Sequence, residues 1–87
     1  MKTTSEAQEK AVAVKRVVNV LWRCTHLSRR EQDGRARISM GELMATYSST
    51  YPSASQQEMH SGLNELAEMG EVEIVAEDVL FDLSKLP

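Results

Sequence analysis

Few side chains in this chain of 87 residues are of types that carry out chemistry. The candidates for binding a soft metal ion are one cysteine, Cys24, and two histidines, His26 and His60. Zinc sites draw on paired cysteines or paired histidines at short spacing, and the chain contains no such pair. Cys24 falls in an apolar row and is expected to be a small buried residue, whereas both histidines are expected at the surface. We therefore predict neither a metal site nor a cofactor.

Arrangements of residues that serve catalysis are missing in the same way. The sequence offers no Ser–His–Asp arrangement, no paired acidic motif and no glycine-rich phosphate loop. Its serines are numerous, but their positions fit helix caps and turns, where a hydroxyl satisfies free backbone groups. We predict that the protein is not an enzyme and that its function rests on its surface.

Basic and acidic residues are sorted along the chain. Residues 10–37 contain eight lysines and arginines against two acidic residues, and residues 38–87 contain one lysine against nine acidic residues. The two parts therefore carry about +6 and about −8 within a net charge of −3. The arginines expected to contact a nucleic-acid backbone are Arg23, Arg29, Arg30, Arg35 and Arg37. Alternatively, these arginines pair with the acidic part of the same chain or of a second copy.

The elements that position these residues follow from the spacing of apolar residues. A long helix is predicted over residues 5–27, because two neighbouring apolar rows recur at helical spacing. The first row is Ala7, Ala11, Val14, Val18, Leu21 and Thr25, and the second is Ala13, Val17, Val20, Cys24 and Leu27. Either both rows form one broad core face, or one of them packs on a second copy to give a homodimer. Residues 1–4 are expected to be disordered, and Trp22 is expected in the core.

Two shorter helices follow the long one. Residues 28–36 form a predicted polar loop, and residues 37–38 form a very short strand. A capping box at Ser39 opens the first short helix, which ends before Pro52 because the residue preceding a proline avoids helical geometry. A second capping box at Ser55 opens the next helix, and a glycine after its last apolar residue suits a left-handed cap.

The chain ends in a predicted β-hairpin. Apolar and polar residues alternate over residues 72–83 around a turn at 76–78, and Val75 and Leu80, which break the alternation, are expected to be exposed. Long helix, short strand, helix, helix and hairpin is the order of a winged helix-turn-helix domain. We therefore predict a single domain over residues 1–87 that is mainly α-helical, with a small two-stranded hairpin as the wing.

Two stretches resemble the C-terminal winged helix of replication initiators of the origin-recognition and cell-division-cycle type. Residues 38–43, followed by Tyr47 and Ser48, are similar to the start of the helix-turn-helix in that family, where an aliphatic residue, a Ser or Thr and a glycine lead to a tyrosine. Residues 57–70 are similar to the third helix of that domain with its terminal glycine. The resemblance implies a winged helix that acts in DNA replication.

Two departures from the family pattern bear on function. The chain contains no Gly-x-x-x-x-Gly-Lys motif, so the ATPase module of such initiators is absent from it. The basic residues that DNA-binding members carry on the third helix and wing are also absent, and acidic residues stand there instead. DNA phosphates would repel this acidic surface, since both carry negative charge. The surface also lacks the Lys and Arg residues that position a recognition helix on the DNA backbone before it reads bases.

The favoured function is therefore a winged-helix interaction module in a DNA-handling assembly, with a protein as its partner. The residues expected to bind that partner are Gln56, Gln57, His60, Asn64, Glu73 and Asp78, on the third helix and the wing. The alternative is a DNA-binding domain, a transcription regulator or initiator fragment, that contacts duplex DNA through the basic first helix and loop. The single cysteine, the lack of an apolar run of about 18 residues and the lack of a signal core predict an intracellular protein, cytoplasmic or nuclear, with no membrane segment.

Overall fold

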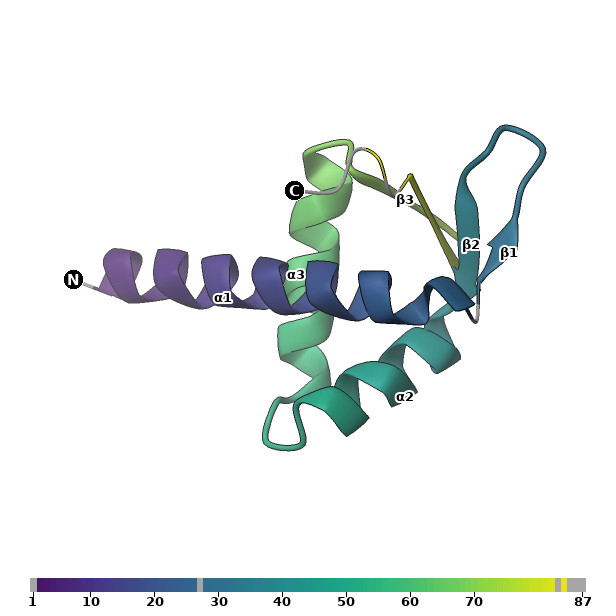
Figure 1. Cartoon of the computed structure of the whole chain (residues 1–87). Helices are drawn as coiled ribbons and strands as arrows, with labels where there is room; N and C mark the ends of the chain where they lie inside the picture. Colours follow the sequence, from purple (N-terminus) through teal and green to yellow (C-terminus); the bar gives the residue numbers. More distant parts are fainter. Residues whose placement is uncertain (1, 27, 83, 85–87) are drawn as a thin grey trace.

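Three α-helices and a four-stranded antiparallel sheet make up a small, mostly helical α/β domain (Figure 1). The computed structural model describes residues 2–26, 28–82 and 84, without the side chains of residues 2–7 and 26. The numbers of helices and strands refer to these described residues. The helices are α1 (Lys2–Arg23), extended by the 3-10 turn η1 (Cys24–His26), α2 (Met40–Thr50) and α3 (Gln56–Glu68). The strands are β1 (Arg29–Arg30), β2 (Ala36–Ser39), β3 (Val72–Val75) and β4 (Asp78–Phe81), in the sheet order β1-β2-β4-β3. The three predicted helices and the C-terminal hairpin are confirmed.

The sheet is larger than the predicted two-stranded hairpin. Residues 28–36, predicted to be a polar loop, contain β1 and the first residue of β2, which pair with each other as a hairpin. β2 in turn pairs with β4, from Ala36 opposite Phe81 to Ser39 opposite Asp78. The two arginines of β1 carry no alternating apolar signal, so spacing alone could not reveal this edge strand.

The first helix starts earlier than predicted, and both of its apolar rows contribute to the core. α1 begins at Lys2 rather than at a cap on Ser5, so residues 2–4 belong to the helix. Val17 and Leu21, one from each row, are both completely buried. Beyond the protruding N-terminal part of α1 (Figure 1), both rows therefore contribute to one broad core face, although Val14 and Thr25 of the first row are only half-buried. A homodimer through this helix stays a prediction.

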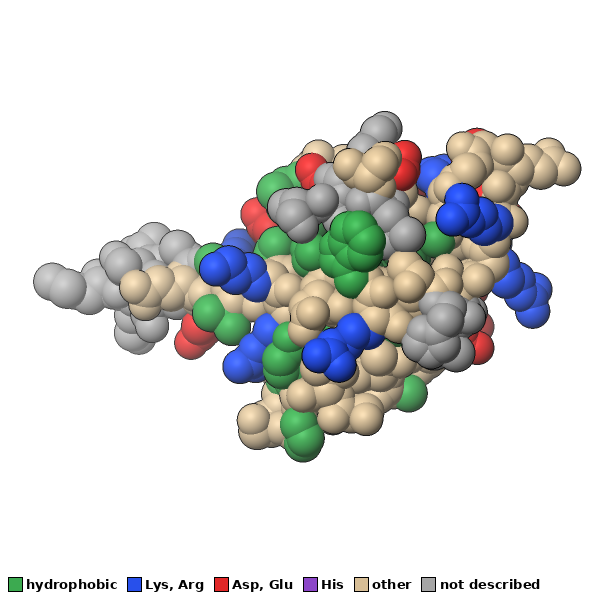
Figure 2. All heavy atoms as spheres, viewed as in Figure 1, with side chains coloured by type: hydrophobic (Ala, Val, Ile, Leu, Met, Phe, Trp, Pro, Cys, Tyr) green, Lys and Arg blue, Asp and Glu red, His purple; other side chains and the backbone are tan. Residues whose placement is uncertain are grey.

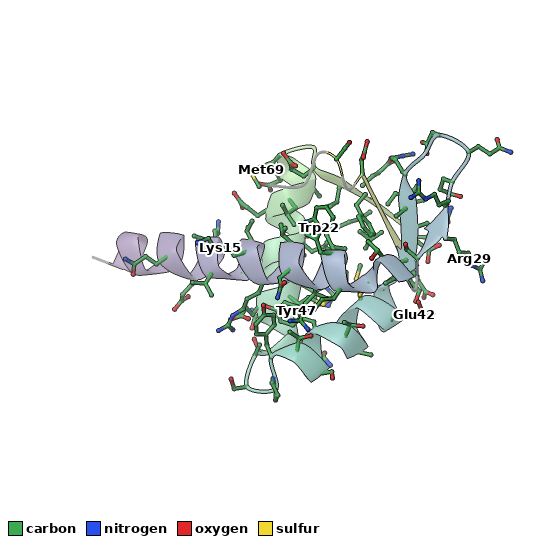
Figure 3. All side chains as sticks on the ribbon, viewed as in Figure 1. Lys15, Trp22, Arg29, Glu42, Tyr47 and Met69 are labelled. Carbon is green, nitrogen blue, oxygen red and sulfur yellow. The ribbon has the colours of Figure 1, made fainter. Side chains whose placement is uncertain are left out.

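Trp22, expected in the core, is 46% exposed. Successive residues of an α-helix are rotated by about 100° around its axis, so a residue that follows the inward-facing Leu21 points to the side of the core. Figure 3 shows Trp22 beside the ribbon of α1, on the side away from α2. The prediction for Trp22 was wrong because a tryptophan next to an apolar row does not have to lie in it.

α1 packs mainly on α3, and the two backbones approach closely at Gly62. A Cβ atom at Gly62 would lie 2.7 Å from both the carbonyl carbon and the carbonyl oxygen of Ala13, closer than real Cβ atoms approach such atoms. The crossing of α1 over α3 therefore requires a residue without a side chain at this position.

A polar cluster joins all three helices. The Tyr47 hydroxyl of α2 donates a hydrogen bond to the Glu58 carboxylate of α3, which also accepts one from Arg16 of α1 at 3.0 Å. The Arg16 guanidinium lies 4.8 Å from the ring centre of Tyr51, in the turn between α2 and α3. The pKa of Tyr47 is raised, mainly by burial of the hydroxyl and secondly by its hydrogen bond to Glu58. These contacts fix α3 relative to the other two helices.

The hairpin differs from its prediction at one residue. Val75 is exposed, as expected, but Leu80 is only 5% exposed. Leu80 lies in β4, between β2 and β3, directly opposite Arg37 on one side and Glu73 on the other. The aliphatic parts of such charged side chains shield an apolar neighbour, so the central strand buries this residue even on the outer face of the sheet.

Candidate interaction surface

Two of the five arginines predicted to contact nucleic acid form ion pairs on the outer face of the sheet. The pairs are Arg35 with Asp33 (2.7 Å) and Glu73 (2.9 Å), and Arg37 with Glu31 (2.9 Å) and Asp78 (2.8 Å). The hydrogen bonds to Glu73 and Asp33 raise the pKa of Arg35, and those to Glu31 and Asp78 raise the pKa of Arg37. Arg35 and Arg37 therefore pair with acidic residues of the same chain, as the alternative prediction states.

The other three arginines are exposed and have no acidic partner among the described residues: Arg23, Arg29 and Arg30. They do not form one basic patch with the rest of α1. Figure 2 shows the basic side chains of this face standing apart along α1 and near β1. Arg29 lies beyond the C-terminal end of α1, far from Lys15 (Figure 3). It lines a hollow together with the acidic residues Glu42 and Asp78.

The exposed face of α3 is less acidic than predicted. Glu58 and Glu65 both face α1, where Glu58 pairs with Arg16 at 3.0 Å and Glu65 lies 4.0 Å from Lys10. Positions 58 and 65 are seven residues apart, which is about two helical turns, so both carboxylates lie on the same side of α3. Of the three carboxylates counted on this helix, Glu68 alone lacks an ion pair within the described part of the chain.

The residues predicted to bind a partner fall into two groups. Gln56, Gln57, His60 and Asn64 are exposed on α3. Glu73 and Asp78 lie on the outer face of the sheet, opposite the side on which Val79 is buried, and both are engaged with arginines. Asp78 belongs to β4 and not to the turn, which consists of Ala76, in a left-handed conformation with a φ of 53°, and Glu77. The acidic wing of the prediction is therefore largely neutralised.

A hollow of about 540 Å³ separates the exposed end of α1 from the start of α3. It is lined by Glu9, Lys10, Ala13, Ser55, Gln57, Glu58 and Ser61. Its mixed charged and polar lining continues the polar face of α3. Cys24 is buried, and burial raises the pKa of its thiol.

Reasoning from the sequence missed the open edge of β3. Within residues 2–26, 28–82 and 84, β3 is the terminal strand of the sheet, and its residues Ile74 and Val75 are 36% and 39% exposed. The exposure of Val75 was predicted from the break in alternation, but alternation does not indicate which strand of a hairpin lies at the edge of the sheet.

No group of three or more potential metal ligands lies together in residues 2–26, 28–82 and 84. No helix in this part of the chain has the length and apolar character needed to cross a membrane. Compared with known proteins, the chain matches no family model, no curated protein and no solved structure at a significant level.

Proposed function

We propose that this protein is a winged helix-turn-helix domain that binds another protein and not duplex DNA. The proposed fold is supported by the order of the elements, with α2 and α3 joined by a turn at residues 51–55 and followed by the β3–β4 hairpin. The pairing of β2 with β4 gives the three-stranded sheet that completes such a domain. A DNA-handling assembly is the setting that the resemblance to replication initiators favours.

One observation carries the choice of a protein partner. Arg35 and Arg37 are the basic residues nearest to the wing in the sheet, and both are engaged by acidic side chains of the same domain. No lysine or arginine occurs from residue 38 to residue 84, which includes α2, α3 and the wing. Contacts from Lys and Arg to phosphates supply nearly all nonspecific affinity for DNA, so this surface has no means of holding a duplex.

A fluorescence anisotropy titration of a labelled mixed-sequence duplex tests this proposal. We expect no measurable binding at physiological salt, even at a protein concentration of about 10⁻⁴ M, at which typical nonspecific binders are at least half saturated. The variant Gln57→Lys/Asn64→Lys, which adds two cations to the exposed face of α3, should gain salt-sensitive binding and serves as the positive control. Saturable binding of the unmodified protein that weakens steeply as salt rises would overturn the proposal.

DNA binding through the first helix and loop remains the second candidate, and one observation favours it. Arg23, Arg29 and Arg30 are exposed, with no acidic partner in the described part of the chain. If this candidate holds, Arg29→Ala/Arg30→Ala removes duplex binding in the same titration. The matched control is Arg35→Ala/Arg37→Ala, which removes two equal charges that are already paired and should change binding little.

A further inference from the structure

We propose that the free edge of β3 accepts an extended segment of a partner protein as a fifth strand, and that basic and apolar residues alternate in this segment. The inference rests on the proposed function, since it presumes a protein partner. It assigns the contact to the β3 edge and not to the face of α3.

The backbone of β3 has hydrogen-bonding groups that point away from the sheet. Val75 lies opposite Asp78 across a two-residue turn, so these two residues exchange hydrogen bonds with each other. Because bonding direction alternates along an antiparallel strand, Ile74 directs its N–H and C=O to the free edge, and Val72 does the same. At the other end of the sheet, β1 has only two residues, so β3 offers the longer edge.

The side chains of this edge are apolar and exposed. Ile74 and Val75 are two of the five large exposed hydrophobic residues of the described chain. Natural proteins usually protect an edge strand with a charge, a proline, a bulge or a covering segment. The one charged residue within β3, Glu73, is paired with Arg35. The strand is therefore suited to main-chain pairing, with apolar contacts along it.

Acidic residues at both ends of β3 select the charge of the segment. Glu77 is exposed in the turn, and Glu71 precedes the strand, with its Oε2 atom buried and without a hydrogen-bond partner among the described residues. Neither Glu71, which is half-buried, nor the exposed Glu77 forms an ion pair within the described residues, so an arginine or lysine of the segment can pair with their carboxylates. Antiparallel pairing with β3 of a second copy would instead bring two acidic ends together, which disfavours a homodimer at this edge.

The register of the added strand follows from the alternation of faces. Side chains opposite Glu71 and Glu73 lie on the outer face and should be basic, because Glu71 forms no ion pair among the described residues and the Glu73 carboxylate can accept a second cation beside Arg35. Side chains opposite Val72 and Ile74 should be apolar. The probe is therefore the peptide acetyl-Thr-Val-Arg-Val-Arg-amide, whose threonine lies opposite Val75 in antiparallel pairing. The charge-reversed control is acetyl-Thr-Val-Glu-Val-Glu-amide.

Each peptide is titrated into the ¹⁵N-labelled protein, and the chemical shifts of the protein amides report binding residue by residue. The basic peptide should shift the amides of residues 72–75 most, and the acidic peptide should shift none of them. N-methylation of the valine opposite Ile74 removes a donor to the edge and should weaken binding about tenfold. N-methylation of the arginine opposite Glu73, whose N–H points away from β3, should change binding less than twofold.

Matched variants of the protein separate edge pairing from attraction between charges. Ile74→Pro removes the N–H that faces the free edge and leaves the bonds to β4 intact, so circular dichroism should report a folded domain. This variant should lose the response to the basic peptide, whereas Ile74→Val should keep it.

Three outcomes would overturn the inference. They are shifts that persist in Ile74→Pro, the absence of shifts in β3, and shifts of β3 with protein concentration alone, which would indicate self-pairing. The duplex titration tests the proposed function separately. Negligible duplex binding together with an unresponsive β3 rejects the edge and leaves the choice of a protein partner standing.

Discussion

Replacing Gly62 by alanine tests whether the close approach of α1 and α3 sets the position of α3. The added Cβ would lie 2.7 Å from the backbone of Ala13 and 3.0 Å from a methyl group of Val17. Ordinary contact begins at 3.4 Å, so the two helices must separate by about 0.7 Å (3.4 − 2.7) at this point. The shift cannot be absorbed by a flexible side chain, because the obstructing atoms belong to a helix backbone.

The expected loss of stability is the difference between two opposing effects. Overpacking a close-packed core costs about 1–3 kcal/mol, and a clash with backbone atoms belongs at the upper end of that range. Alanine is favoured over glycine inside a helix by about 1 kcal/mol, which offsets part of the cost. We therefore expect Gly62→Ala to lower the free energy of unfolding by about 2 kcal/mol, and Tm by roughly 8–16 °C for a domain of this size.

Thermal and urea denaturation followed by circular dichroism measure this difference, and the chain contains a matched control. Gly41 also lies in a helix, α2, but a Cβ placed there meets no atom within 4 Å. Gly41→Ala should therefore raise stability by about 0.5 kcal/mol through helix propensity alone. If Gly62→Ala is as stable as Gly41→Ala, the reasoning from the close approach is refuted.

Three further substitutions have expected outcomes that denaturation measurements can check. Since its pKa is raised in the folded state, Tyr47 stays neutral there while the unfolded chain ionises, so stability should fall as pH rises above about 10. Tyr47→Phe should cost about 1–2 kcal/mol at neutral pH, because Glu58 loses its hydroxyl donor. The variant should also lose less stability than the unmodified protein above about pH 10, and an unchanged alkaline profile would contradict this. Leu80→Ala should cost about 2–3 kcal/mol, as for a buried leucine, whereas a loss below about 0.5 kcal/mol would mean that Leu80 is exposed after all. Ser55→Ala should cost about 1 kcal/mol of stability, because the Ser55 hydroxyl accepts a hydrogen bond from the backbone N–H of Glu58. Ser55→Asp should keep the stability of the unmodified protein, because its carboxylate can accept the same hydrogen bond.

Features that depend on neighbouring residues were predictable from the sequence. The Ser39 and Ser55 hydroxyls accept hydrogen bonds from the N–H groups of Glu42 and Glu58, as the capping boxes predict. Gly70 has a φ of 78°, the left-handed geometry expected after the last apolar residue of α3. Steric limits and free backbone groups at a helix end act over three or four residues, so sequence spacing contains them.

Charge pairing at the candidate surface could not be predicted in this way. Arg35 meets Glu73 and Arg37 meets Asp78 across about 40 positions of the chain, because β2 and the hairpin become neighbours in one sheet. Counting acidic residues along α3 and the wing overstated the repulsion of DNA, since a count contains no information on where the opposite charges lie. Electrostatic attraction depends on distance in space, and packing sets that distance.

Local sequence was enough to predict the helices, the Ser39 and Ser55 caps, the C-terminal hairpin and the lack of basic residues from position 38 to position 84. The exposure of Trp22, the burial of Leu80, the addition of β1 to the sheet and the position of β3 at its edge depend on the packing of the whole domain. The first group arises from interactions between residues a few positions apart. The second depends on which surfaces meet when the elements pack, and many distant residues determine that together.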